Sequence, residues 1–449
     1  MLRMILSSVM GILWAGAGFC GAAEPPGGGP GPVGGGATVP VVERVELVSD
    51  QALVGDGGNN WGGHQTRIVR TRDGVFIAYT TGESDPPGPW RAYSGTPRSW
   101  KLAVRKDGGW PVLAEDKSGR EPVNLMASPD GSLHIIAWPG GAPHLWSGKP
   151  VGGAVTMKGG PIPGPWVVNN WPYGAAGISA KGDLALVQST TEEAPGRFIW
   201  GYRPAGTDRW QTGTTPVKQR HCYTYVLPEA GGRLSFTSTR DVLWSTMGYQ
   251  KSATGHSLGY VFNRVGHWAT DDVLKKPTTE LQIDESIPSK EFPEVAACGT
   301  CVDSYIDTKG RLHVLYFFMG PETKGQQHIR HAIVENGRML KTVGLPAEIS
   351  GCFAGPGDKA KARPQFCRMI QDTAGRFYLL GTTAIIPADS EDGTTLGKPV
   401  PLDLKGYQVE YSGIAVAAPR GGTPLADSVD CVFPTGDGKK VVYCSIRLR

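Results

Sequence analysis

DTKGRLHVL (307–315) and DTAGRFYLL (372–380) are two copies of a signature that occurs six times along the chain. In each copy, a short turn sequence that ends in glycine is followed by an apolar stretch typical of a β-strand. A glycine, usually preceded by Asp, Lys or Ala, suits the positive φ of a tight hairpin turn. The sequence therefore predicts antiparallel hairpins in series. The other copies are TRDGVFIAY (71–79), SPDGSLHII (128–136), SAKGDLALV (179–187) and EAGGRLSFT (229–237).

The spacing of these signatures predicts the fold class. Successive turn glycines lie from 50 residues apart (Gly182 to Gly232) to 78 residues apart (Gly232 to Gly310), which is room for four short strands. A ring of four-stranded sheets fits this period, because closure of the ring removes exposed sheet edges. We expect an all-β, seven-bladed propeller, whose last blade joins the hairpin at 428–447 to a strand around 41–48. A six-bladed ring and a pair of β-sandwiches are the alternatives.

Composition excludes several classes of protein. Of 449 residues, 40% are hydrophobic and 19% charged, and 64 Gly and 36 Pro make long helices improbable. A net charge of +4 is too balanced for a protein that binds nucleic acid by bulk electrostatics. After the first residues, no apolar stretch is long enough to span a membrane. We expect a monomer that binds no nucleic acid and has no membrane span.

The N-terminal segment predicts export. A positive start is followed by an apolar run from Met4 to Phe19 and by the small residues Gly21-Ala22-Ala23, as in a secretory signal peptide. Residues 24–40 are rich in Gly and Pro and predict a flexible tether. We therefore expect a signal peptide at 1–23, a tether at 24–40, one propeller domain at 41–449, and a secreted or periplasmic location. A lipoprotein attached through Cys20 is the alternative.

Cleavage would leave an odd number of cysteines, so at least one thiol stays unpaired. A two-residue turn at Asp437-Gly438 would place Cys431 opposite Cys444, in a non-hydrogen-bonded pair suited to a disulfide. The CxxC at Cys298 and Cys301 has no partner motif for a zinc site. The seven cysteines are Cys222, Cys298, Cys301, Cys352, Cys367, Cys431 and Cys444.

Alignment on the turn glycines shows what each blade offers to the central channel. Positions seven and about ten residues upstream carry polar, aromatic and ionisable side chains. Trp and Tyr stack on sugar rings, and amide and charged groups bind sugar hydroxyls, so this ring suits carbohydrate. The predicted substrate-binding residues are Arg67, Glu121, Asn124, Trp171, Tyr173, Tyr225 and Arg363.

Other motifs give little. No GxSxG, P-loop, HExxH or dinucleotide-binding fingerprint occurs. The acidic loops 83–89 and 389–395 lack regular ligand spacing, so we expect no metal or other cofactor, and structural Ca²⁺ is unsupported. His134 and His313 are expected to be buried in strands, whereas His328 and His331 are expected at the surface.

One stretch carries a family resemblance. NNWGGHQTRIVRTRDGVFIAY (59–79) resembles the opening blade of sialidase-like, BNR-type propellers, and is most similar to their polysaccharide lyase branch, the ulvan and rhamnose–glucuronate lyases. In that branch a Gly-His, here Gly63-His64, precedes an inner strand. A second pattern, with a tyrosine-bearing inner strand, a Gly turn and a strand ending in arginine, matches YTYVLPEAGGRLSFTSTR (223–240). The histidine that ulvan lyases place after the first outer strand is missing, and no Asp-box occurs.

The resemblance implies β-elimination from a uronic acid. Arg240 would counter the substrate carboxylate, and His64 or His221 would serve as base or acid. Tyr223 would protonate the leaving oxygen, or act as the base once ionised beside arginine. The predicted catalytic residues are therefore His64, Tyr223, Arg240 and His221, and the expected partner is a polysaccharide. A glycoside hydrolase, which needs two facing carboxylates, and a non-catalytic carbohydrate-binding propeller are the alternatives.

Overall fold

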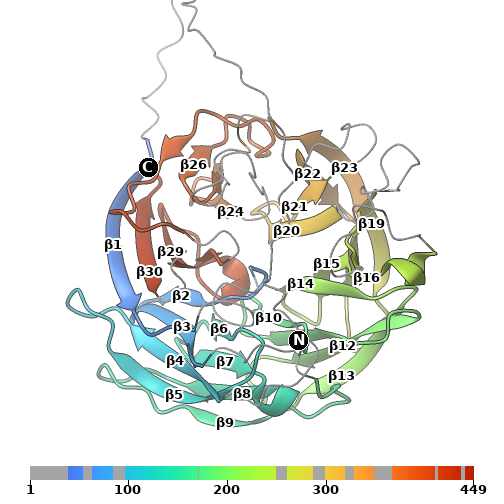
Figure 1. Ribbon diagram of the computed structural model, residues 1–449, viewed down its shortest axis with the longest axis horizontal. Helices are drawn as coiled ribbons and strands as arrows, with labels where there is room; N and C mark the ends of the chain where they lie inside the picture. The colour runs from blue at the N-terminus through green and yellow to red at the C-terminus, as the bar shows by residue number, and fades with distance from the viewer. Residues whose placement is uncertain are drawn as a thin grey trace, which may run out of the picture.

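The structure, a computed structural model, describes residues 39–53, 63–83, 97–169, 171–248, 260–286, 299–318, 328–346, 349, 367–409, 413–435 and 440–449. Within them, seven four-stranded antiparallel sheets follow one another around a central axis (Figure 1). The molecule is a seven-bladed β-propeller, which confirms the predicted fold class and blade number. The six-bladed ring and the paired sandwiches are wrong.

The first three blades follow chain order from the inner strand outward. Blade I contains β2 (Ile68–Thr71), β3 (Gly74–Gly82), β4 (Arg98–Val104) and β5 (Val112–Ser118). Blade II contains β6 (Asn124–Ala127), β7 (Leu133–Ala137), β8 (His144–Gly148) and β9 (Lys158–Pro161), with the short helix η1 (Pro139–Gly141). Blade III contains β10 (Gly174–Ile178), β11 (Leu184–Ser189), β12 (Gly196–Arg203) and β13 (Gln211–Val217).

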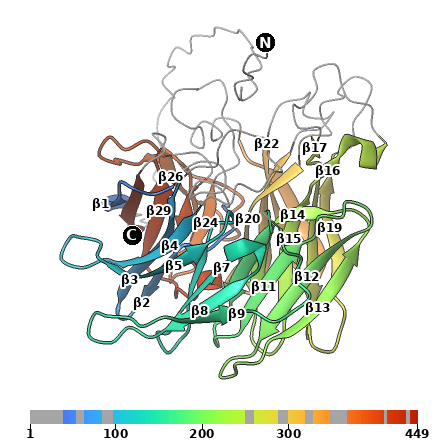
Figure 2. The ribbon, with the colours of Figure 1, turned by 60° about the horizontal axis from the view of Figure 1, so that its bottom comes forward.

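Blade IV contains β14 (His221–Pro228), β15 (Leu234–Arg240), β18 (Arg264–Thr270) and β19 (Thr279–Glu285). The turned view shows the strands of the blades side by side, with the β16 (Val242–Leu243) and β17 (Tyr260–Val261) pair and η2 (Trp244–Met247) at one end of blade IV (Figure 2). Blade V contains β20 (Gly299–Ile306), β21 (Leu312–Phe318), β22 (His328–Glu335) and β23 (Arg338–Gly344). Blade VI contains β24 (Arg368–Gln371), β25 (Phe377–Leu380), β26 (Ala384–Pro387) and β27 (Val400–Pro401).

Blade VII closes the ring with strands from both ends of the sequence. Its order is β28 (Ala415–Val416), β29 (Ser428–Pro434), β30 (Val441–Arg447) and, outermost, β1 (Val41–Ser49). Val41 pairs with Arg447 and Ser49 with Val441. The predicted closure by an N-terminal strand is confirmed. Between β28 and β29 the chain forms the short helix η7 (Pro419–Gly421) in the middle of the ring (Figure 1).

Two sequence features account for this architecture. The six turn glycines all have positive φ, from 77° at Gly310 to 138° at Gly74, so the predicted hairpin geometry is confirmed. Apolar residues of neighbouring blades form one buried cluster at each of the seven interfaces. At the interface of blades III and IV, for example, the rings of Phe198 and Trp268 lie 4.9 Å apart. Burial of each large side chain contributes about 1.5–3 kcal/mol.

The predicted disulfide is not present. Cys431 pairs with Cys444 in register as expected, but both are buried free thiols. Thr435 N donates to Lys440 O (3.0 Å), and every second pair along the ladder, including Cys431 with Cys444, is then a hydrogen-bonded pair. Side chains lie farther apart in such pairs, so the predicted hydrogen-bond phase was wrong. In the described part of the chain, no helix has the length and hydropathy needed to cross a bilayer.

Candidate functional site

Four of the predicted residues meet where inner strands begin. The rings of His64 and Tyr223 lie 5.9 Å apart, edge to face, and those of Tyr173 and Tyr223 lie 5.7 Å apart. Trp171 stacks beside Tyr173 at 6.4 Å. Because these residues precede or begin inner strands of blades I, III and IV, the ring closure brings them together across more than a third of the sequence. They are the centre of the candidate site.

The two tyrosines have a strained backbone. Tyr173 (φ 48°) and Tyr223 (φ 59°) are in the left-handed region, which is unusual for a bulky residue. Both lie nine residues before the turn glycine of their blade, Gly182 and Gly232 respectively, so the feature is repeated. At Tyr223 the ladder between β14 and β15 skips register between Cys222 and Tyr225. Such bulges re-aim side chains and cluster beside active sites.

Tyr223 is a proton donor at neutral pH. Burial, reinforced by Tyr173 and Asp241, raises the pKa of the Tyr223 phenol well above its usual value. The same cause raises the pKa of Tyr173. Both side chains nevertheless keep part of their surface exposed. The site therefore presents two protonated phenols.

His64 lies beneath these rings. Its side chain is only 3% exposed, and Nε2 lies 3.8 Å from Glu121 Oε1 and 3.1 Å from Gln65 Nε2. Burial, and then the positive charges of Arg420, Arg368 and Arg67, lower the pKa of His64 to about 3. The imidazole is therefore neutral at physiological pH.

Glu121 joins three blades. Its Oε1 accepts a hydrogen bond from Gln65 Nε2 (2.7 Å), and its Oε2 accepts one from Tyr173 N (3.1 Å). Glu121 thus fixes the main chain of a strained tyrosine. Burial raises the pKa of this carboxyl to about 8, although both hydrogen bonds oppose the shift. Glu121 is mainly protonated at neutral pH, and a neutral carboxyl beside a neutral imidazole leaves this pair without charge.

Arg67, Asn124 and Tyr225 belong to a belt that ties neighbouring blades together. Five of the six side chains seven positions before the turn glycines hydrogen-bond to the main chain of an adjacent blade. The pairs are Arg67 with Gly413 O, Asn124 with Ala176 N (3.2 Å), Tyr225 with Val302 O (2.5 Å), Asp303 with Met369 N (2.8 Å) and Arg368 with Ile414 O (2.9 Å). The polar ring expected from the sequence at this level is thus engaged in blade-to-blade contacts.

Arg240 and His221 are engaged elsewhere in blade IV. Arg240 Nη1 donates to Glu285 Oε1 (2.6 Å) and to Asn263 Oδ1 (3.1 Å). The His221 ring packs against Trp268 at 4.9 Å in the aromatic interface of blades III and IV. Burial lowers the pKa of His221 to about 3. Arg363 lies outside the described residues.

Guanidinium groups lie beside the aromatic rings, and the predicted site assigned them no role. Arg120 lies 3.7 Å from the Trp171 ring centre and Arg220 lies 5.7 Å from that of Tyr173. Arg220 also forms an ion pair with Asp241 (3.2 Å). Arg420 lies 5.2 Å from the Tyr225 ring centre. Arg120 directly precedes the aligned position of blade II and Arg220 lies two residues before that of blade IV, whereas Arg420 lies outside every copy of the signature.

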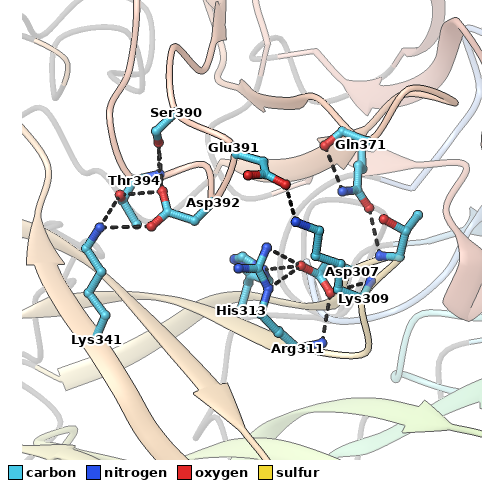
Figure 3. Close-up of polar contacts among 12 residues, drawn as sticks. Asp307, Lys309, Arg311, His313, Lys341, Gln371, Ser390, Glu391, Asp392 and Thr394 are labelled. Carbon is cyan, nitrogen blue, oxygen red and sulfur yellow. Dashed lines mark hydrogen bonds and ion pairs between the residues drawn. The ribbon is translucent and has the colours of Figure 1, made fainter.

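A second buried cluster lies between blades V and VI (Figure 3). Asp307 Oδ2 lies 2.7 Å from Arg311 Nη2 and 3.1 Å from His313 Nε2, and His313 Nδ1 lies 2.9 Å from His331 Nε2. His331 is buried, so its expected surface location was wrong. The acidic loop 389–395 is neutralised by lysine: Lys341 Nζ lies 2.8 Å from Asp392 Oδ2. Among described residues, no group of His, Cys, Asp and Glu could hold a metal ion.

No protein-family model matches the sequence, and no curated protein matches it. Solved structures do. The polysaccharide lyase Uly1 is 11% identical, with a TM-score of 0.51, and the match covers 91% of this chain and 100% of that one. An oligogalacturonate lyase from Vibrio parahaemolyticus (10% identity, TM-score 0.48, 90% and 97% coverage) and a lectin from Aleuria aurantia (10%, 0.37, 80% and 97%) also match. At 11% identity the likeness to Uly1 shows a shared fold alone.

Proposed function

We propose that this chain is an exported polysaccharide lyase that cleaves a uronic-acid-containing polymer by β-elimination at the mouth of the propeller. One observation carries the proposal: a protonated phenol, Tyr223, held by a backbone bulge, lies edge-on to the neutral imidazole of His64 at 5.9 Å. A proton donor beside a neutral base is the pair that this reaction needs. The predicted signal peptide and the fold shared with Uly1 are consistent with the proposal.

The roles follow from charge. His64 removes the proton α to the carboxylate, and the electron pair forms the new carbon–carbon double bond as the bond to the 4-linked oxygen breaks. Tyr223 gives its proton to that oxygen. A nearby substrate carboxylate would raise the proton affinity of His64, because it offsets the guanidinium charges that lower it.

The carboxylate needs a cation, and Arg240 is already paired with Glu285. Arg420 is better placed, because its guanidinium donates a hydrogen bond to the main-chain oxygen of His64 and the residue is only partly buried. We therefore assign the neutralising field to Arg420 and to Arg368 behind it, instead of Arg240. A planar guanidinium suits a carboxylate geometrically.

A non-catalytic carbohydrate-binding propeller is the second candidate. The observation that favours it is the burial of His64, since a base must reach its substrate. The hydrolase alternative has no such support, because Glu121 and Asp303 both accept main-chain hydrogen bonds across blades.

The test is to incubate the purified protein with a panel of uronate-containing polysaccharides. An unsaturated product that absorbs in the near ultraviolet supports the lyase. New reducing ends without that absorbance indicate hydrolysis, and binding without either signal indicates a lectin-like protein. A His64→Gln preparation, purified in the same way, controls for contaminating lyase and is expected to form no product.

A further inference from the structure

The segment between β28 and β29 crosses the centre of the ring. Its short helix η7 (Pro419–Gly421) contacts β6, β10 and β14 of three other blades. Gly422 has φ +86°, and a Cβ atom there would lie 1.9 Å from Ala127 O of blade II. Thr423 Oγ1 accepts a hydrogen bond from Arg70 N of blade I (2.9 Å). We call residues 417–427 the plug, because the chain there is fixed to the inner wall of the channel.

The plug carries Arg420 to the turn that holds His64. Arg420 Nη1 donates to the main-chain oxygen of His64 (2.6 Å), and its guanidinium lies 5.2 Å from the Tyr225 ring centre. His64 lies in a turn before β2, where no sheet ladder holds its main chain. A charge-assisted hydrogen bond of this kind is about twice as strong as a neutral one. The two residues are 356 positions apart in sequence.

We propose that the plug is the floor of the site and that Arg420 is a positioning residue, which holds His64 under Tyr223 and sets its charge state. The inference rests on the proposed function for its catalytic consequence, but the contact with His64 is independent of it. Arg420 is the first charge that lowers the pKa of His64 after burial itself. One side chain thus fixes both where the imidazole lies and how readily it takes a proton.

The test uses the full chain and the variants Arg420→Gln and Arg420→Lys. The first readout is the titration of His64 by NMR with isotope-labelled histidine, assigned through His64→Gln. In Arg420→Gln we expect the pKa of His64 to rise by about one unit, because a like charge is removed. We also expect kcat to fall about tenfold and the acid limb of its pH profile to move upward. Arg420→Lys, which keeps the charge, should leave the titration near wild type but lower kcat.

Arg72→Gln is the matched control, because Arg72 has a 73% exposed side chain on a hairpin turn. It should change neither readout. A folded Arg420→Gln variant with unchanged His64 titration overturns the inference. So does Arg420→Lys if it fails to fold, or if it retains wild-type kcat and pH profile. Should the wild type form no unsaturated product, the proposed function fails, while the His64 titration still decides the role of Arg420.

Discussion

Two buried clusters in this propeller place a histidine beside a carboxyl group, and they shift the pKa of that carboxyl group in opposite directions. His64 lies 3.8 Å from Glu121 near the channel, and His313 lies 3.1 Å from Asp307 between blades V and VI. Burial raises the pKa of Glu121 to about 8. Burial acts in the same direction on Asp307, but hydrogen bonds from His313 and Arg311 outweigh it and hold the pKa of Asp307 well below its usual range.

The opposite pKa shifts of Asp307 and Glu121 follow from the groups that donate hydrogen bonds to each carboxyl. Asp307 has a guanidinium 2.7 Å away, and its Oδ1 accepts hydrogen bonds from the main-chain N–H groups of Lys309 and Arg311. Glu121 has an amide and one main-chain N–H as donors. The Asp307 cluster thus satisfies its charge with partners from its own blade, whereas Glu121 and His64 are both held in their neutral forms at pH 7. Both clusters have perturbed pKa values, so they differ in the protonation state of the carboxyl group and not in the presence of a shift.

The largest expected effect is on turnover. Tyr223→Phe removes only the phenolic oxygen, so we expect kcat to fall by about 10²- to 10⁴-fold, the usual value of a positioned acid or base. Formation of the unsaturated product measures it. Tyr407→Phe is the control, because Tyr407 is a half-buried tyrosine that packs against the core of blades VI and VII. Equal turnover in Tyr223→Phe and wild type would remove Tyr223 from the mechanism.

The second-largest effect is a loss of stability from a substitution in the Asp307 cluster. Asp307→Asn leaves Arg311 and His313 without their charged partner, and loss of one member of a buried pair costs about 3 kcal/mol or more. Chemical denaturation at neutral pH measures the loss, and kcat of the folded protein should be unchanged. Asp130→Asn, at a 59% exposed side chain in the turn of blade II, should alter stability little. Loss of turnover in folded Asp307→Asn would mean that the Asp307 cluster also acts in catalysis and that the two clusters do not differ in role.

Acid titration compares one histidine from each cluster, His64 and His331. The pKa values of His64 and His331 are both lowered to about 3, whereas an unfolded histidine has a pKa of about 6.5. Between about pH 3 and 6.5 the unfolded chain therefore binds more protons than the folded chain. The stability that each neutral histidine contributes is fully present above about pH 6.5 and is lost as pH falls toward about 3. His64→Gln and His331→Gln should each reduce the slope by about 1.4 kcal/mol per pH unit. Only His64→Gln should abolish turnover; abolition by both would contradict the comparison.

The architecture was predictable because its signals are local. Each hairpin needs one positive-φ glycine, such as Gly310 or Gly375, followed by an apolar strand, and six repetitions specify the ring. The same register predicted that His64, Tyr173 and Tyr223 converge. It did not predict their backbone strain, because a bulge depends on the pairing with the next strand.

The rest depends on contacts between distant segments. Arg240 matched a family pattern, yet Glu285, on the fourth strand of the same blade, occupies it. His331 seemed a flanking residue, but its partner His313 lies on the adjacent strand. Arg420 reaches the site through a segment without repeat or motif. Alignment on the turn glycines compares equivalent positions of successive blades, and it cannot show which side chain from another strand fills the space beside them.

The smallest loss of stability is expected from the change of acid to amide at Glu121, although the same change should be costly at Asp307. In the folded chain Glu121→Gln replaces a carboxyl that is mainly protonated at pH 7 by a neutral amide, so the free energy of unfolding at pH 7 should not fall. Gln65 Oε1 is buried and has no hydrogen-bond partner among the described residues, so a flip of its amide lets it accept from the new side chain. The folded pKa of Glu121 is raised, so its contribution to stability is fully present below the unfolded pKa of about 4.5 and is lost as pH rises from there to about 8. Denaturation between about pH 4.5 and 8 should therefore show a flatter pH profile for Glu121→Gln than for wild type. A loss as large as that of Asp307→Asn at pH 7 would mean that Glu121 is ionised and paired, and that the two clusters do not differ in charge.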